Sequence, residues 1–263
     1  MSPCLLVETA TNGVATLLLN RPERHNAFDD VLIVALTEAL QKLDADPAVR
    51  VVVLAAQGKN FSAGADLGWM QRMAGYAEAD NLADARKLAQ LMETLDRLSK
   101  PVIGAAQGAT FGGGVGLIAC CDLVVASNDA QFCLSEVKLG LIPAVISPYV
   151  VRKIGVAAAR RYFLTAERFS ASEAQRFGLV HELAPADELP SLSHALAEHL
   201  LANGPQALAA AKRLIHDIAD RPIDAELIDD TARRIAAIRV GAEGQEGLKA
   251  FLEKRPPNWI KPR

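Results

Sequence analysis

Short apolar runs that recur along the first half of the chain constrain its fold more than any other feature. Four of them are expected to form strands, at residues 14–19, 51–55, 102–106 and 123–126. The run "VVVLA" at 51–55 is apolar at every position, which suits a strand that is covered on both faces of a sheet. Because segments with helical spacing separate these runs, the sequence predicts an α/β fold with a parallel sheet.

Helical segments lie between the strands and dominate the second half of the chain. Phe28, Leu32, Leu36, Leu40 and Leu43 recur at helical spacing, which predicts a helix with Asn26 as its N-cap. Other helices are expected at 83–98, from 115 to 120, and at 157–164, 171–177, 192–202 and 205–238, with a short strand at 132–134. No low-complexity linker divides the chain, so we expect one α/β core with helices packed on it or on a neighbouring subunit.

The composition excludes several classes of function. A formal net charge of −3 and an aromatic content of 5% give the chain no general attraction for nucleic acid. The amino end, "MSPCLLVETATNG", has no basic region before a long apolar run, and no apolar stretch reaches about 20 residues. We therefore expect a cytoplasmic protein without a membrane span. The four cysteines show no paired CxxC spacing, so reduced, buried thiols are expected rather than a disulfide framework or a zinc site.

Two loops built from small residues are the first candidates for a functional site. They read "NFSAGADL" at 60–67 and "FGGGVGL" at 111–117, and each follows an expected strand. Residues without bulky side chains let a ligand approach the backbone N–H groups, and a helix that begins near Val115 would add its positive dipole end. An anion or a developing oxyanion fits such a site. The alternative is that these glycines only allow a strand and a helix to pack tightly. One such loop alone would fit packing as well as ligand binding, but the presence of two loops favours ligand binding.

Other motifs for ligands or nucleophiles are missing from the sequence. No GxGxxG opens a βαβ unit with an acidic residue at the right distance, and no GxxxxGK[ST] is present. The GxSxG elbow of serine hydrolases is absent too, and the five histidines are mostly scattered over helical stretches, where they are expected to be solvated or to cap helices.

Glu136 is the candidate catalytic group. It stands between Leu134 and Val137 in the otherwise apolar segment "AQFCLSEVKLGLIPAV", beside a glycine and proline turn. Most glutamates of a folded protein lie on its surface, and this is the alternative for Glu136. The apolar setting argues instead for a partly desolvated carboxylate, whose pKa would be raised.

The chain resembles the enoyl-CoA hydratase/isomerase (crotonase) superfamily along nearly its whole length. The resemblance is carried by "NRPERHNAF" at 20–28, "FSAGADL" at 61–67, "GATFGGGVGLIACCDLVVAS" at 108–127, "FCLSEVKLGLIP" at 132–143 and "EGQEGLKAFLEKRPPNW" at 243–259. It implies a spiral of repeated ββα units with a C-terminal helical region, acyl-CoA thioester substrates, no metal, and trimers that commonly pair into hexamers. Residues 1–200 would form the spiral core with the acyl-CoA site, and residues 201–263 would serve oligomerisation and closure of the site.

The resemblance also assigns roles to individual residues. It implies that the backbone N–H groups of Ala65 and Gly113 hold the thioester oxygen as an oxyanion hole, and that Glu136 acts on the acyl group. No separate cofactor is implied, because coenzyme A enters as part of the substrate. The residues that would border the bound CoA or substrate are Arg24, His25, Ala27, Ala63, Asp66, Leu67, Phe251 and Lys254.

Gly116 departs from the pattern of the two-carboxylate hydratases, which carry a glutamate there as a partner of the one at the position of Glu136. The next turn, "IPAVISP" at 142–148, also differs from the glycines that are common in the family, and we expect it to reshape the acyl end of the pocket. A single carboxylate can hydrate a double bond if it takes a proton from water and returns one to the same face of the substrate. It also serves family isomerases, which return the proton two carbons away.

The segments "FSAGADLGWMQRM" and "CLSEVKLGLIPAVISPYVVRKIG" are most similar to a bacterial branch of methylglutaconyl-CoA hydratases, with a relative that acts on isohexenylglutaconyl-CoA. Both substrates carry a second carboxylate, which would need a cation such as Lys138, Arg152 or Arg72. A binding or scaffold protein that has lost catalysis, or one that binds RNA, is the alternative from another class. Retention of Glu136 argues against simple decay of the site.

Overall fold

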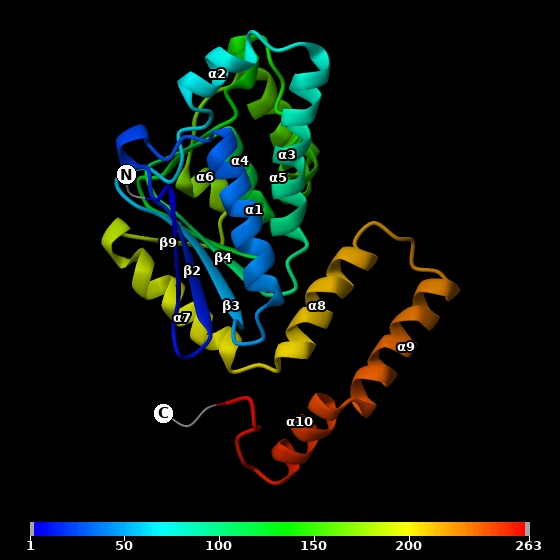
Figure 1. Ribbon diagram of the computed structural model, residues 1–263. Coiled ribbons are helices and arrows are strands. Elements are labelled where there is room, and N and C mark those ends of the chain that lie inside the picture. The colour runs from blue at the N-terminus through cyan, green and yellow to red at the C-terminus, as the bar shows by residue number, and fades with distance from the viewer. Residues whose placement is uncertain (1–2, 261–263) are drawn as a thin grey trace.

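The computed structural model describes residues 3–260 of the chain (Figure 1). Its elements, in chain order, are β1 (Leu5–Thr9), β2 (Val14–Leu19), η1 (Pro22–Arg24), α1 (Asp30–Ala45), β3 (Val51–Ala56), α2 (Leu67–Met73), α3 (Glu78–Asp96), β4 (Val102–Ala106), β5 (Ala109–Phe111), α4 (Gly113–Cys120), β6 (Leu123–Ser127), β7 (Gln131–Cys133), η2 (Glu136–Leu139), α5 (Ser147–Thr165), β8 (Phe169–Ser170), α6 (Ala171–Arg176), β9 (Glu182–Ala184), η3 (Ala186–Glu188), α7 (Leu189–Leu201), α8 (Pro205–Ile218), α9 (Ala225–Val240) and α10 (Ala242–Leu252).

Two sheets form the core, and they confirm the predicted α/β class and crotonase-like fold. The larger sheet has the order β1-β2-β3-β4-β6-β9, with β1 antiparallel to β2 and all the other neighbours parallel. The smaller sheet has the order β5-β7-β8. Twice, a strand of the large sheet is followed by a strand of the small sheet and then by a helix, in β4-β5-α4 and in β6-β7-η2-α5.

Helices cover both faces of the large sheet, which explains its continuous apolar strands. On one face α4 packs against α3 and α5, while α1 packs against α3. On the other face α7 contacts β3, β4 and β6 (Figure 1). Seven of the eight residues of α4 are buried, so the glycine-rich loop leads into the centre of the core. The helix predicted from residue 115 begins two residues earlier, at Gly113.

The predicted N-cap of the first helix is wrong. Asp29 caps α1, because its side chain accepts a hydrogen bond from the N–H of Leu32 at 2.9 Å. Asn26 is fully buried with φ of 52°, and its side chain accepts from the N–H of Arg21 and donates to the carbonyls of Gln57 and Asn60. It therefore joins the loop before α1 to the loop after β3.

Two later helices also differ from their predicted extents. The helical stretch predicted at 205–238 is divided into α8 and α9, because the chain turns at Pro222 and restarts with Asp224 as the cap of α9. Helix α5 begins at Ser147, ten residues before the predicted 157, and Gly155, with φ of 74° and ψ of 162°, interrupts it.

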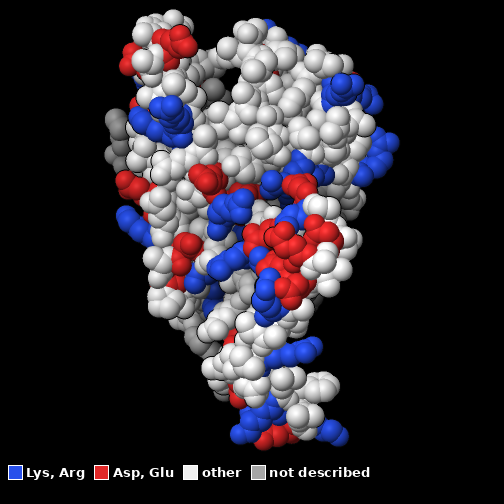
Figure 2. All heavy atoms as spheres, turned by 90° about the vertical axis from the view of Figure 1, so that its right-hand side faces the viewer, with Lys and Arg blue, Asp and Glu red and all other residues white. Residues whose placement is uncertain are grey.

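The helices α8, α9 and α10 extend away from the sheets (Figure 1). Arg234 of α9 forms ion pairs with Asp217 of α8 and with Asp230 of its own helix. Figure 2 shows charged side chains gathered in the middle of this face of the molecule, below a surface that is mostly uncharged. Arg50 donates to the carbonyls of Leu201 and Asn203, which anchors the start of this extension to the core.

Cys120, Cys121 and Cys133 are buried free thiols, as predicted, and Cys4 is half-buried. Within residues 3–260, no helix is both long and apolar enough to cross a bilayer.

Candidate active site

The two small-residue loops lie side by side at the start of α4. The N–H of Phe28 donates to the carbonyl of Gly64 at 2.7 Å, and the N–H of Asp66 donates to the carbonyl of Phe28 at 2.7 Å. The N–H of Phe111 donates to the carbonyl of Ser62 at 2.8 Å, so the first loop is also fastened to β5. These bonds fix both loops as one surface.

The N–H groups of Ala65 and Gly113 remain free in this arrangement. Throughout the described part of the chain, neither group donates to a protein acceptor, although their neighbours Gly64 and Asp66 take part in the loop hydrogen bonds. Ala65 is exposed and Gly113 half-buried. Gly113 is the first residue of α4, so its N–H also lies at the positive end of the helix dipole. The pair is therefore suited to bind an oxyanion.

Glu136 lies over the entry to α4. A Cβ atom placed on Gly112 would stand 3.2 Å from Oε1 of Glu136, which puts the carboxylate next to the residue that precedes Gly113. Oε2 is buried and has no hydrogen-bond partner among the described residues. Burial raises the pKa of Glu136, and a backbone hydrogen bond opposes this only in part. A half-buried carboxylate with an unused oxygen is suited to exchange protons with a ligand.

Ile146 fills the place beside Gly116, where the two-carboxylate pattern has a glutamate. A Cβ atom on Gly116 would stand 2.3 Å from Cγ2 of Ile146 and 3.3 Å from Sδ of Met92. Ile146 is 3% exposed, so its side chain cannot simply turn into solvent. The missing carboxylate is thus replaced by an apolar contact, and Gly116 is required by that contact. No sequence pattern pointed to Ile146, apart from its place in the unusual "IPAVISP" turn.

Asp66 caps α2 and pairs with two arginines beside the first loop. Its Oδ1 accepts hydrogen bonds from the N–H groups of Gly68 and Trp69, which caps α2, and its Oδ2 lies 3.1 Å from Arg24 and 3.3 Å from Arg21. Burial opposes ionisation of this carboxyl, but the bonds from Arg24, Trp69 and Gly68 outweigh it and lower the pKa of Asp66. Arg21 was missed by sequence reasoning, because only the fold brings it to Asp66.

The remaining residues predicted to border the CoA fall into two groups. His25, Ala27, Ala63 and Leu67 lie in the same loops as Arg24 and Asp66, where the N–H of Ala63 donates to the carbonyl of His25 and Leu67 is 77% exposed. Phe251 and Lys254 lie at the end of α10, which packs on α8 and α9, and one chain does not bring them to the loops (Figure 1).

The three cations considered for a distal carboxylate also lie apart. Arg72 pairs with Asp30 at 2.5 Å, and Arg152 lies 4.0 Å from Asp96 beneath α8. Lys138 is exposed on η2, two residues after Glu136, and forms no ion pair among the described residues. Within residues 3–260 no three His, Cys, Asp or Glu side chains gather in a way that could hold a metal ion.

Comparison with known proteins agrees with this geometry. The family model for enoyl-CoA hydratase/isomerase matches residues 9–262. The chain is 33% identical to 2,3-dehydroadipyl-CoA hydratase of Escherichia coli over 97% of this chain and 98% of that protein. It is 31% identical to crotonyl-CoA hydratase of Syntrophomonas wolfei over 94% of each. The crystal structure of an enoyl-CoA hydratase from Shewanella pealeana is similar, with a TM-score of 0.95 and 49% identity over 98% of this chain and 96% of that one. The chain therefore belongs to the enoyl-CoA hydratase/isomerase family.

Proposed function

We propose that this enzyme adds water to a β-branched enoyl-CoA with a distal carboxylate, converting 3-methylglutaconyl-CoA to 3-hydroxy-3-methylglutaryl-CoA. The observation that carries the proposal is a single half-buried carboxylate, Glu136, with a free oxygen beside the free N–H groups of a two-loop oxyanion site. Hydration of enoyl-CoA thioesters is the activity that the family membership supports.

The oxyanion site provides the electrostatic part of the reaction. The thioester oxygen would accept hydrogen bonds from the N–H groups of Ala65 and Gly113. When a nucleophile attacks the β carbon, electrons move onto this oxygen, and donors that are already oriented stabilise the charge. One such donor is worth about 10²–10³ in rate.

Glu136 provides the proton transfers. In its ionised form it takes a proton from water while the water oxygen bonds to the β carbon and the double bond shifts to form the enolate. The protonated Glu136 then gives that proton to the α carbon, which regenerates both the thioester and the carboxylate. Both additions occur on the face that Glu136 covers, so no second base is needed.

The lack of a glutamate at position 116 removes a negative charge that would repel an acidic acyl group. A second glutamate at position 116 would place another negative charge near the distal carboxylate of such a substrate. Two like charges about 4 Å apart repel by about 4 kcal/mol at an effective dielectric constant of about 20. The relative named 2,3-dehydroadipyl-CoA hydratase acts, by that name, on an acyl group that also ends in a carboxylate. Lys138 is exposed and lies two residues after Glu136, and it is our candidate for the cation that pairs with the distal carboxylate of the substrate.

A homo-oligomer, either a trimer or a pair of trimers, is part of the proposal. Ile223, Phe251 and Leu252 of the C-terminal helices and their links are 87%, 81% and 78% exposed, which is costly for large apolar side chains in a lone chain. A neighbouring copy would cover them and could bring its own Phe251 and Lys254 to the CoA. Light scattering should give three or six times 28.1 kDa, and a monomer would contradict this part.

The test is a product assay of the purified protein with 3-methylglutaconyl-CoA, crotonyl-CoA, a 3-enoyl-CoA and the glutaconyl ester with an isohexenyl branch. A gain of one water on 3-methylglutaconyl-CoA, faster than on crotonyl-CoA, is the expected result. Migration of the double bond without a gain of mass would make the enzyme an isomerase, because a single carboxylate serves that reaction too. Preference for the isohexenyl ester would identify the other branched substrate, and no turnover of any ester would favour a binding role.

A further inference from the structure

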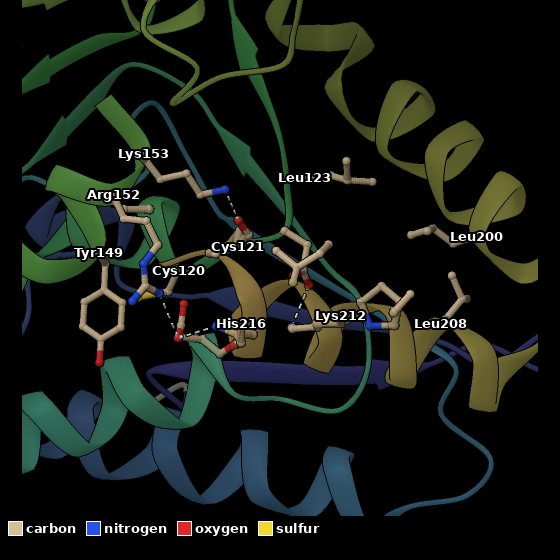
Figure 3. A pocket seen from close by; sticks show the side chains of 17 residues that line it. Cys120, Cys121, Leu123, Tyr149, Arg152, Lys153, Leu200, Leu208, Lys212 and His216 are labelled. Atoms are coloured by element: carbon tan, nitrogen blue, oxygen red, sulfur yellow. Dashed lines mark hydrogen bonds and ion pairs between the residues drawn. The ribbon is translucent and has the colours of Figure 1, made fainter. Parts of the chain in front are cut away.

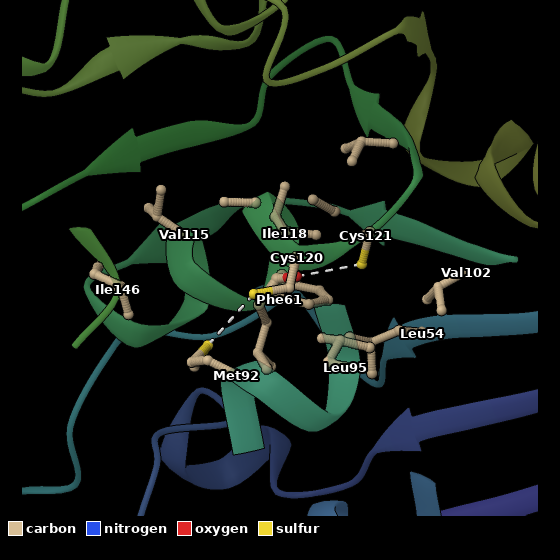
Figure 4. Packing of buried hydrophobic residues seen from close by; sticks show 14 of the residues in the cluster. Leu54, Phe61, Met92, Leu95, Val102, Val115, Ile118, Cys120, Cys121 and Ile146 are labelled. Carbon is tan, nitrogen blue, oxygen red and sulfur yellow. Dashed lines mark hydrogen bonds between the residues drawn. The ribbon is translucent and has the colours of Figure 1, made fainter. Parts of the chain in front are cut away.

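A row of small residues along α4 leads away from Glu136. Gly116 and Cys120 are four residues apart and lie on one face of the helix, and Gly112, the N-cap, precedes Gly116 by another four residues. Glu136 lies over Gly112 and Ile146 over Gly116. Met92 contacts both of the last two positions, since its Sδ would lie 3.3 Å from a Cβ on Gly116 and lies 3.9 Å from Sγ of Cys120. Figure 4 shows Ile146 and Met92 flanking α4 near Cys120.

A cavity of about 460 Å³ opens at the far end of this row. Its walls include Cys120 of α4, Tyr149 and Arg152 of α5, and His216 of α8 (Figure 3). The volume is in the usual range for a small-molecule site. The active-site carboxylate is not among the residues that line it, and nothing in the loops of the oxyanion site lines it either.

Ile146 and Met92 lie between the carboxylate and the cavity, because they pack beside Gly116 and Met92 also contacts Cys120, which lines the cavity. We call this pair the wall, although neither side chain lines the cavity itself. Both are buried in the main core cluster, at 3% and 0% exposure. Tyr149, which lines the cavity, lies three residues after Ile146, about one helical turn further along the chain. Helix α4 rises about 1.5 Å per residue, so Gly116 and Cys120 are only about 6 Å apart along it.

We propose that Ile146 is the residue that limits the size of the β-branch, by closing the acyl pocket at Gly116 and separating it from the cavity beneath α8. The inference rests on the proposed function and narrows its substrate class. The enzyme would prefer an ester whose β-branch has one carbon, as in 3-methylglutaconyl-CoA, to one whose β-branch has six, as in the isohexenyl ester. Without the Ile146 side chain, space would open beside Gly116 in the direction of Met92 and Cys120, and a longer apolar branch could extend through it toward the cavity once Met92 moves.

The lining of the cavity suits such a branch. Ala119, Leu208 and Ile215 provide apolar surface. The charged groups at its edge already have partners, because Lys212 lies 2.7 Å from Asp122, Arg152 lies 4.0 Å from Asp96, and Lys153 donates to the carbonyl of Cys121. Met92 is the flexible part of the wall, since an unbranched thioether side chain adapts readily to a new neighbour.

The test compares Ile146→Ala with the wild-type enzyme on two esters that differ only in the β-branch, one carbon against six. Ile146→Val, which removes one methyl group, serves as a graded second variant if the Ala variant folds poorly. We expect Ile146→Ala to raise the ratio of kcat/KM for the long branch to that for the short branch by at least tenfold, with a smaller rise for Val.

A blocking variant tests the route. Ala211 of α8 lines the cavity and is itself exposed, so a larger side chain there should fill the cavity without disturbing the core. Ile146→Ala combined with Ala211→Phe should lose the gain for the long branch, whereas Ala211→Phe alone should leave turnover of the short branch unchanged. Binding of the saturated long-branch ester, measured by calorimetry, provides a readout that needs no turnover and should follow the same order.

The possible outcomes separate this inference from the proposed function. Equal turnover of both branches by the wild-type enzyme, or an unchanged ratio in Ile146→Ala, would overturn the role of Ile146 while leaving the hydratase in place. Turnover of crotonyl-CoA alone would instead overturn the proposed substrate. In that case the same variants would be compared on crotonyl-CoA and 2-dodecenoyl-CoA. Ile146→Ala should again raise the ratio of kcat/KM for the long ester to that for the short one.

Discussion

Oε1 of Glu136 lies so close to Gly112 that a Cβ atom there would stand 3.2 Å from it. The next residue, Gly113, offers the free N–H at the start of α4. The proposed acid–base group and one proposed oxyanion donor therefore meet at a single tight turn, where Glu136 packs on Gly112 and Gly113 carries the N–H group. Gly112 adopts φ of 50° and ψ of −118°, which side-chain-bearing residues rarely reach.

Gly112→Ala tests this relationship. The added methyl group would press on Glu136 and strain the turn that places the Gly113 N–H, so we expect kcat to fall by about 10²-fold, the loss that a misplacement of about 1 Å can cause. Steady-state kinetics with a thermal melt as control would check it. Gly140→Ala, at another positive-φ glycine but with no atom within 4 Å of its added Cβ, is the matched variant and should lose some stability but little turnover.

Glu136→Gln removes the proposed proton-transfer group while keeping its size. General acid–base catalysis contributes about 10²–10⁴ in rate, so kcat should fall by about that factor. Binding of a saturated acyl-CoA should change little, because the oxyanion donors belong to the backbone. Glu188→Gln, at an exposed glutamate of η3, is the control and should behave like the wild-type enzyme. Near-normal turnover of Glu136→Gln would contradict the assignment.

The pH dependence of stability gives an independent test of the environment of Glu136. Burial raises the pKa of this carboxyl above its ordinary value of 4.5, so the fold favours the protonated form. The contribution to stability is then fully present below about pH 4.5 and is lost as the pH rises through the folded pKa. Glu136→Gln should melt at a higher temperature than the wild-type enzyme at pH 8, and the difference should shrink toward pH 4. A constant difference across this range would contradict a raised pKa.

The strands and the two small-residue loops were predictable because they depend on local patterns. Continuous apolar runs such as 51–55 became buried parallel strands, and the apolar setting of Glu136 correctly indicated partial burial. Ile146 could not be predicted as the occupant of the space beside Gly116, because that contact joins residues 30 positions apart in the chain.

The N-cap of α1 and the ion-pair partner of Arg24 also could not be predicted from local sequence patterns. Asn26 and Asp29 are both good capping residues, and only the left-handed backbone of Asn26 decides between them. The resemblance implies that Arg24 borders the CoA, and no sequence pattern indicates its ion pair with Asp66, 42 residues away. The CoA contacts themselves stay predictions.

The packing of Gly116 against Ile146 should appear as a coupling of free energies of unfolding. Gly116→Ala overpacks the contact and should cost about 1–3 kcal/mol, and Ile146→Ala leaves a cavity and should cost about 2–5 kcal/mol. In the double variant the new methyl group has room, so the combined cost should be lower than the sum by about 0.5–3 kcal/mol. Denaturant unfolding of the four proteins measures the cycle. Additive costs would mean that the two side chains do not compete for one space.

Arg24→Ala tests the cationic edge of the site. The Arg24 side chain is 57% exposed and its ion pair with Asp66 is the kind of surface pair that contributes about 0–1 kcal/mol, so the variant should fold normally. If the guanidinium also meets a CoA phosphate, its loss should raise KM by about three- to tenfold with kcat unchanged, since about 1.4 kcal/mol corresponds to tenfold in affinity. Arg72→Ala is the matched control, because Arg72 is 50% exposed and pairs with Asp30. The effect should weaken as salt screens the charges, and an equal KM for both variants would exclude Arg24 from the CoA site.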